Sequence, residues 1–329
     1  MSTTTNTLQR SIKAWIYEAI GKGQSVINGL TKGDAQEVLE VSRKNWIING
    51  DMQVSQRGDY TSASSATNND YYLDRWKTYL SAITADKQDT GGWLKLTATA
   101  TDGAMGFTQI IEDVDSFTGK TFTISAKVKS TNTDARILVS DQSTWFASSE
   151  GHIGDGNEQR LTVTGTLSSS ATSFNVSLRI ATSTASATTI TDGDYIEFTN
   201  VKLEIGDTAT PFEVEPYAEV LRKCQRYCWR TANGETYSFI GSGYNASTIN
   251  SLILMTYPEM RVAPTLTTLG SFQVVAGGSV YSVTGISMSD PTEQICRLNC
   301  TVSGATTSDF AVLRNNNDAA AYLLLDAEL

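Results

Sequence analysis

Four cysteines and one histidine are the residues of this 329-residue chain that could bind a soft metal ion. The cysteines form two pairs with three residues between the partners, Cys224 with Cys228 and Cys296 with Cys300. Structural zinc sites more often use pairs with two intervening residues, and a helical pair four residues apart has poor geometry for a disulfide. Each pair falls on the same face of its predicted helix or strand as apolar residues. We therefore expect buried free thiols, with zinc binding and a disulfide as alternatives.

The histidine and the carboxylates offer acid–base or metal chemistry. His152 lies in GHIGDG, where the glycines predict a turn, and we expect it to be solvated. Asp192, Asp194 and Glu197 cluster in TDGDYIEF, and with the distant Asp51 they could supply oxygen ligands for calcium or a carboxylate pair for glycoside hydrolysis. The alternative, which we favour, is a turn with solvated carboxylates. The sequence has no nucleophile elbow, phosphate loop or dinucleotide fingerprint, so we expect no catalytic residue and no cofactor.

Aromatic residues at strand ends and in loops suggest binding chemistry, because an aromatic face can stack on a sugar ring. Packing in a core is the alternative for each aromatic residue taken singly. Three consecutive asparagines near the C-terminus predict a strand turn. The expected ligand-binding residues are Tyr71, Tyr72, Trp93, Trp145, Tyr244, Asn315, Asn316 and Asn317.

The charge balance excludes several partners. Lys and Arg number 25 against 35 Asp and Glu, which gives a net charge of −10. Such a chain has no general positive field for nucleic acid or for anionic membranes. It also has no apolar run of the roughly 18 residues that a membrane span needs, and its N-terminus lacks the apolar segment of a signal peptide. We therefore expect synthesis in a reducing cytoplasm, no nucleic acid partner and no membrane insertion.

The first 44 residues show helical spacing and form the first predicted segment. Apolar residues that fall at i, i+3, i+4, i+7 and i+8 are Ile12, Trp15, Ile16, Ala19 and Ile20. The sequence GKG ends this helix, and a second short helix is expected to begin near Asp34. Two short helices bury too little area to be stable alone, so the apolar stripe needs a partner. That partner is a sister chain, another protein or the next domain of the same chain.

From Asn45 onwards the pattern is mainly strand-like. About eight alternating segments separated by polar loops predict a jelly-roll β-sandwich over residues 45–212. Residues 213–230 predict one linking helix, with an apolar face around Val220. Residues 231–329 are again strand-like and predict a smaller C-terminal β-sandwich. The predicted fold class is mainly β, with short N-terminal helices and a helix between two sandwiches.

Several short motifs follow one another in an order that resembles bacteriophage tail-fibre and receptor-binding proteins. NWIINGDMQVSQRG at 45–58 resembles the opening of a module repeated in these proteins, and YLDRW at 72–76 follows at the expected place. The later matches are residues 201–206, 209–212, 216–217 and 221–227 for the closing strand and exit helix, and 257–265 and 326–329 for the distal domain. The first module also resembles a carbohydrate-binding-module jelly roll, but it lacks the acidic pair that usually binds calcium.

The resemblance implies a virion structural protein, a trimeric tail fibre that binds a host-surface glycan or receptor. It implies a homotrimer in which residues 1–44 attach to other virion proteins and the C-terminal sandwich is the exposed end. A head fibre or capsid decoration protein is one alternative. An enzyme that degrades host polysaccharide is the second, although such phage enzymes commonly carry a long parallel β-helix, whose repeat is absent here.

Overall fold

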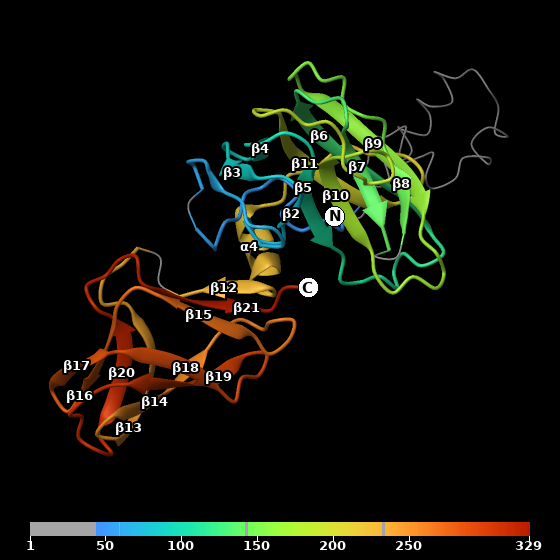
Figure 1. Cartoon of the computed structure of the whole chain (residues 1–329). Coiled ribbons are helices and arrows are strands. Elements are labelled where there is room, and N and C mark those ends of the chain that lie inside the picture. Colours follow the sequence, from blue (N-terminus) through green and yellow to red (C-terminus); the bar gives the residue numbers. More distant parts are fainter. Residues whose placement is uncertain (1–43, 59, 142–143, 232–233) are drawn as a thin grey trace, which may run out of the picture.

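The computed structural model describes residues 44–58, 60–141, 144–231 and 234–329 (Figure 1). These residues contain two large hydrophobic cores. The first core gathers buried residues between Ile47 and Leu203, and the second gathers those between Ile253 and Ala327. Antiparallel strands build both parts, so the predicted mainly β fold class is confirmed. The stripe of Ile12, Trp15, Ile16, Ala19 and Ile20, and the segment 1–44 apart from Lys44, lie outside the described residues.

The N-terminal part is a β-sandwich of two antiparallel sheets. The six-stranded sheet has the order β1 (Ser64–Ser65), β3 (Ala85–Asp89), β4 (Leu94–Ala98), β11 (Tyr195–Ile205), β6 (Thr121–Ser130) and β9 (Gln159–Thr166). The five-stranded sheet has the order β2 (Lys77–Ser81), β5 (Ala104–Ile110), β10 (Asn175–Ile180), β7 (Ala135–Ser140) and β8 (Trp145–Ser148).

Side-chain alternation explains how the two sheets pack. In β6, Phe122, Ile124, Ala126 and Val128 are buried in the first core, as the period of two predicts. The opposite parity of β6 carries polar and charged residues. In the five-stranded sheet, β10 is buried at every position, and a small apolar cluster around Leu138, packed against Tyr79 and Trp145, covers part of the outer face.

The C-terminal part is a smaller sandwich. Its three-stranded sheet has the order β12 (Cys228–Arg230), β21 (Tyr322–Asp326) and β15 (Thr265–Leu269). Its seven-stranded sheet has the order β17 (Ser279–Val283), β16 (Phe272–Ala276), β20 (Phe310–Asn315), β13 (Phe239–Ser247), β14 (Asn250–Thr256), β19 (Ile295–Thr301) and β18 (Gly285–Ser289).

The linking helix is shorter than residues 213–230. Helix α4 spans Tyr217–Gln225, with Pro216 as its N-cap, and Cys228 already pairs with Asp326 in the β12–β21 ladder. Pairing with a strand about 100 residues away therefore ends the helix. Buried Val220 and Cys224 pack with Val54, so the predicted apolar face around Val220 is covered by residues of the same chain. None of the helices among the described residues is long and apolar enough to cross a membrane.

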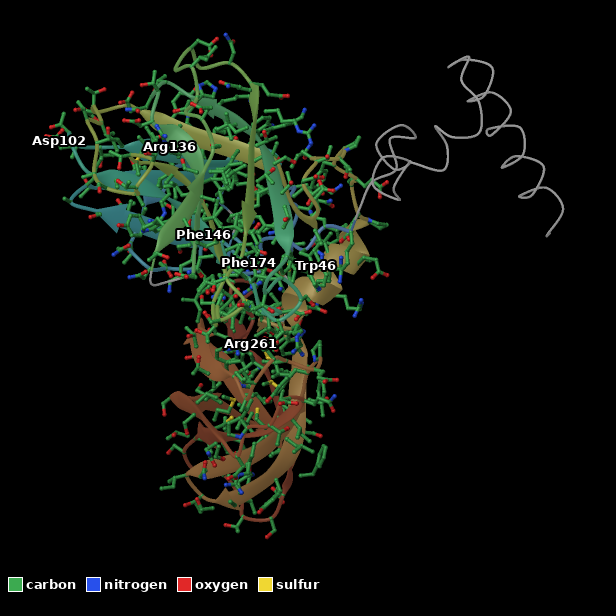
Figure 2. All side chains as sticks on the ribbon, turned by 90° about the vertical axis from the view of Figure 1, so that its right-hand side faces the viewer. Trp46, Asp102, Arg136, Phe146, Phe174 and Arg261 are labelled. Atoms are coloured by element: carbon green, nitrogen blue, oxygen red, sulfur yellow. The ribbon has the colours of Figure 1, made fainter. Side chains whose placement is uncertain are left out.

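The C-terminal residues hold the two sandwiches together. Glu328 accepts hydrogen bonds from the guanidinium of Arg75 and, at 3.4 Å, from Arg57, and all three side chains are at least nine-tenths buried. Arg57 also donates to Asp326 at 2.7 Å. Arg261, which Figure 2 places at the junction, donates to the carbonyls of Ala327 and Glu328, both at 2.9 Å. The ends of two sandwiches are thus joined by buried charge pairs.

Candidate functional site

His152 is buried, not solvated as predicted. Only 1% of the residue is exposed. Its Nδ1 accepts from the Gly154 amide at 2.9 Å, so Nε2 carries the proton and donates to the Asn157 carbonyl, also at 2.9 Å. Both ring nitrogens are therefore occupied, and His152 holds the turn together.

The acidic cluster spans a turn and the start of a strand: Asp192 lies in the turn, Asp194 follows it, and Glu197 lies in β11. Asp194 accepts from the Thr191 amide at 2.9 Å and from Asn132 at 3.0 Å. Burial acts to raise the pKa of Asp194, but these hydrogen bonds outweigh it and lower the pKa. Asp192 is exposed, and Glu197 lies 4.0 Å from Lys129. Over the described ranges, no three His, Cys, Asp or Glu side chains are grouped to hold a metal ion.

All four cysteines are buried and free. Cys296 and Cys300 share one face of β19 with Leu298 in the second core, as predicted. Burial raises the pKa of Cys296 to about 11 and that of Cys300 to about 12, so these thiols stay protonated at neutral pH. Such thiols are core residues and poor nucleophiles.

The predicted aromatic residues have different fates. Tyr72 has no exposed surface and packs in the first core, so its burial does not support a ligand contact. Tyr71 donates from its hydroxyl to the Leu329 carbonyl at 2.6 Å, which places it at the junction of the sandwiches. Trp93 precedes β4 and packs under Lys129, whose Nζ lies 3.8 Å from the ring centroid. Strand parity puts Trp93 on the outer face of the six-stranded sheet and Trp145 on that of the five-stranded sheet, so the two do not meet.

The C-terminal candidates are also dispersed. Tyr244 lies in strand β13, not in a loop, and is 51% exposed opposite Phe310. Asn315 is fully buried, because its amide donates to Glu235 and Asp318 carbonyls and its oxygen accepts from Ser238. The expectation that this asparagine run avoids the core is therefore wrong at Asn315. Asn316 is half-buried, and Asn317 is exposed in the predicted turn with a φ of 46°.

The outer face of the five-stranded sheet carries a pocket beside Trp145, which we call the Arg179 pocket. It has a volume of about 110 Å³. It is lined by Asn69, Lys77, Thr78, Tyr79, Thr108, Ile110, Asn175 and Arg179. Cross-strand pairing builds it, since Thr108 of β5 lies between Lys77 of β2 and Ser177 of β10. Three strands far apart in the sequence therefore contribute to one surface.

Arg179 crosses this face between two aromatic rings. Its guanidinium carbon lies 3.5 Å from the Tyr79 ring centroid and 4.6 Å from that of Trp145. Gly106 separates Arg179 from Tyr79 in the sheet, and a Cβ at Gly106 would come within 2.5 Å of the Arg179 Cγ. Because Gly106 has no side chain, the aliphatic part of the Arg179 side chain can lie across β5. There both aromatic rings attract its guanidinium group.

Hydrogen bonding leaves Arg179 partly unsatisfied. Its Nη2 donates to the Thr108 hydroxyl at 2.9 Å, but Nε and Nη1 have no hydrogen-bond partner among the described residues. The residue is 4% exposed. Burial lowers the pKa of Arg179 to about 10, with Tyr79 acting in the opposite direction. The guanidinium is therefore a buried cation at neutral pH.

Two other hollows are less suited to a ligand. A depression of about 400 Å³ in the C-terminal part is lined by Ala263, Thr292, Glu293 and Gln294, without an aromatic ring or a cation. A cavity of about 110 Å³ at the junction includes Arg75, Glu112 and Tyr227. Its charges are already paired, because Arg75 binds Glu328 and the Tyr227 hydroxyl donates to Glu112 at 2.5 Å.

Of the residues at the Arg179 pocket, the sequence pointed only to Trp145. Arg179, Tyr79, Lys77 and Asn175 were missed. One signal was present: residues 175–180 alternate polar and apolar side chains, and the polar parity ends in an arginine. The aromatic partners could not be found this way, because the order of the strands in the sheet decides which side chains meet.

Comparisons with known proteins gave distant likenesses. No family model and no curated protein matches the sequence. Among solved structures, the tripod from the baseplate of bacteriophage Tuc2009 is 14% identical with a TM-score of 0.28, covering 80% of this chain and 91% of that chain. The N-terminal CBM22 tandem domain of Xyn10C from Paenibacillus barcinonensis is 11% identical with a TM-score of 0.23, covering 83% of this chain and 98% of that chain.

Proposed function

We propose that this protein is a trimeric phage tail-fibre component that adheres to a host-surface glycan through the Arg179 pocket. The observation that carries the proposal is an outward-facing pocket lined by one aromatic ring, two cationic side chains and two amide side chains, with the Trp145 ring beside it. Aromatic faces stack on sugar rings, and amides both donate to and accept from hydroxyl groups. The order of the phage-fibre motifs along the sequence supports the virion assignment.

Adhesion of this kind needs no catalysis. The affinity of each single site can be weak, because a homotrimer carries three copies of the site and a particle carries several fibres. Simultaneous binding of several sites strengthens attachment by roughly 10²–10⁴ over the single-site affinity. Attachment through residues 1–44 would leave both sandwiches free to face the host. Tyr244 is the predicted distal residue that keeps an exposed ring, and it offers a second contact beyond the pocket. A head fibre or decoration protein stays the alternative placement on the particle.

Replacing Trp145 with alanine is expected to weaken binding to purified host-surface polysaccharide by about 5–30-fold. The ring lies beside the pocket, 4.6 Å from the Arg179 guanidinium carbon, so its loss removes a stacking face and a partly desolvated cation–π contact worth about 1–2 kcal/mol. Titration calorimetry with the full chain measures the effect.

The matched control is Trp93→Ala, which removes an aromatic ring under a lysine on the opposite sheet. We expect this variant to bind as the unchanged protein does. If Trp93→Ala loses binding and Trp145→Ala keeps it, the site lies on the other face of the sandwich.

A further inference from the structure

The Arg179 pocket contains cations without counter-ions. Over the described ranges, neither Arg179 nor Lys77 forms an ion pair with a carboxylate. The arginines of similar burial at the junction, Arg57 and Arg75, both pair with Glu328. Arg136, which neighbours Arg179 on β7, pairs with Asp134 at 2.6 Å. Among the described arginines of this sheet, Arg179 therefore differs from Arg136 in having no carboxylate partner.

A buried cation without a partner is unfavourable, because desolvation is not offset by an opposite charge. The cation–π contacts with Tyr79 and Trp145 compensate only in part. Donors on two of the three guanidinium nitrogens are unused by the described residues. Anionic oxygens form the strongest hydrogen bonds with such donors.

From this charge arrangement we infer that the pocket selects glycans that carry an anionic group, a carboxylate or a phosphodiester on the sugar chain. The inference rests on the proposed function and names its ligand class. The volume of about 110 Å³ suits such a group, since about 10–15 Å³ of such cavity space is enough to hold one water. The rest of the saccharide would extend over the sheet towards Trp145.

The net charge of the chain strengthens this inference. At −10, the protein as a whole repels an acidic polymer. Two unpaired cations in one pocket therefore serve local recognition and not long-range steering, which salt would screen within about 8–10 Å. Lys77 also lines the pocket from β2, so the pocket has a second cationic residue besides Arg179.

The test compares three probes on the full chain by titration calorimetry: an oligogalacturonate, a glycerol-phosphate oligomer and an uncharged galactan oligomer. We expect at least one anionic probe to bind tenfold or more tightly than the neutral one. The two anionic arms identify whether a carboxylate or a phosphodiester is preferred. Arg179→Met should abolish the preference, and Arg179→Lys should retain part of it.

Two readouts keep the outcome decisive. Arg136→Met is the matched control, and it should keep the anion preference. Arg179→Met should keep or raise the melting temperature, because an apolar replacement removes an unpaired buried charge. If the neutral probe binds as tightly as the anionic probes and only Trp145→Ala weakens it, the inference is wrong and the glycan proposal stands. If no probe and no host polysaccharide binds, both are wrong.

Discussion

Replacing Glu328 with alanine is expected to lower the free energy of unfolding by about 3–5 kcal/mol. The carboxylate accepts from Arg75 and Arg57, and both guanidinium groups would stay buried with less opposite charge. Arg75 would lose its only ion pair among the described residues, while Arg57 would keep Asp326. Urea denaturation followed by tryptophan fluorescence measures the change, and a split into two transitions would show that the sandwiches have uncoupled.

Glu158→Ala is the matched control for this prediction. Glu158 also forms an ion pair, with Lys127 at 2.8 Å, but both side chains are more than 40% exposed. Exposed pairs contribute about 0–1 kcal/mol. Equal effects of Glu328→Ala and Glu158→Ala would contradict the structural role assigned to the C-terminal residues.

Deletion of residues 1–44 is expected to leave a folded protein that no longer joins virions. Both hydrophobic cores, with the residues packed against them, lie within 46–327, so the described sandwiches retain their contacts. The apolar stripe from Ile12 to Ile20 is the predicted attachment and oligomerisation surface. Immunoblots of purified particles measure incorporation, and circular dichroism checks the fold.

Light scattering adds the oligomeric state to the deletion experiment. The full chain should show a mass near three times 35.6 kDa. A monomer at micromolar concentration would contradict the trimer. Normal incorporation of the shortened protein would show that the anchor lies elsewhere in the chain.

The alternation of apolar and polar residues predicted the strands well, because every second side chain of a strand points to the same face of the sheet. Residues 122–128 and 296–300 alternate apolar and polar side chains, and the structure buries the predicted face of each. Features that depend on distant pairing were missed. Helix α4 ends where Cys228 meets Asp326, and no local signal marks that point.

Neighbouring residues of the same type show why the site was harder to predict. Tyr71 and Tyr72 are adjacent, yet one contacts the C-terminus and the other lies in the core. Asn315 is polar but buried, because the backbone groups of residues 235, 238 and 318 form hydrogen bonds with its side-chain amide. The Arg179 pocket needs residues 77, 108 and 179 on adjacent strands, and this order follows from the sheet alone.

Competition for phage adsorption tests the central claim most directly. Purified full-length protein added to host cells should reduce adsorption of the phage in a dose-dependent way. The Trp93→Ala variant should compete equally well, whereas a variant with Tyr79→Ala and Trp145→Ala should compete poorly while it remains folded at the temperature of the assay. If the unchanged protein neither binds host cells nor competes, host adhesion through this pocket is wrong and the decoration-protein alternative takes its place.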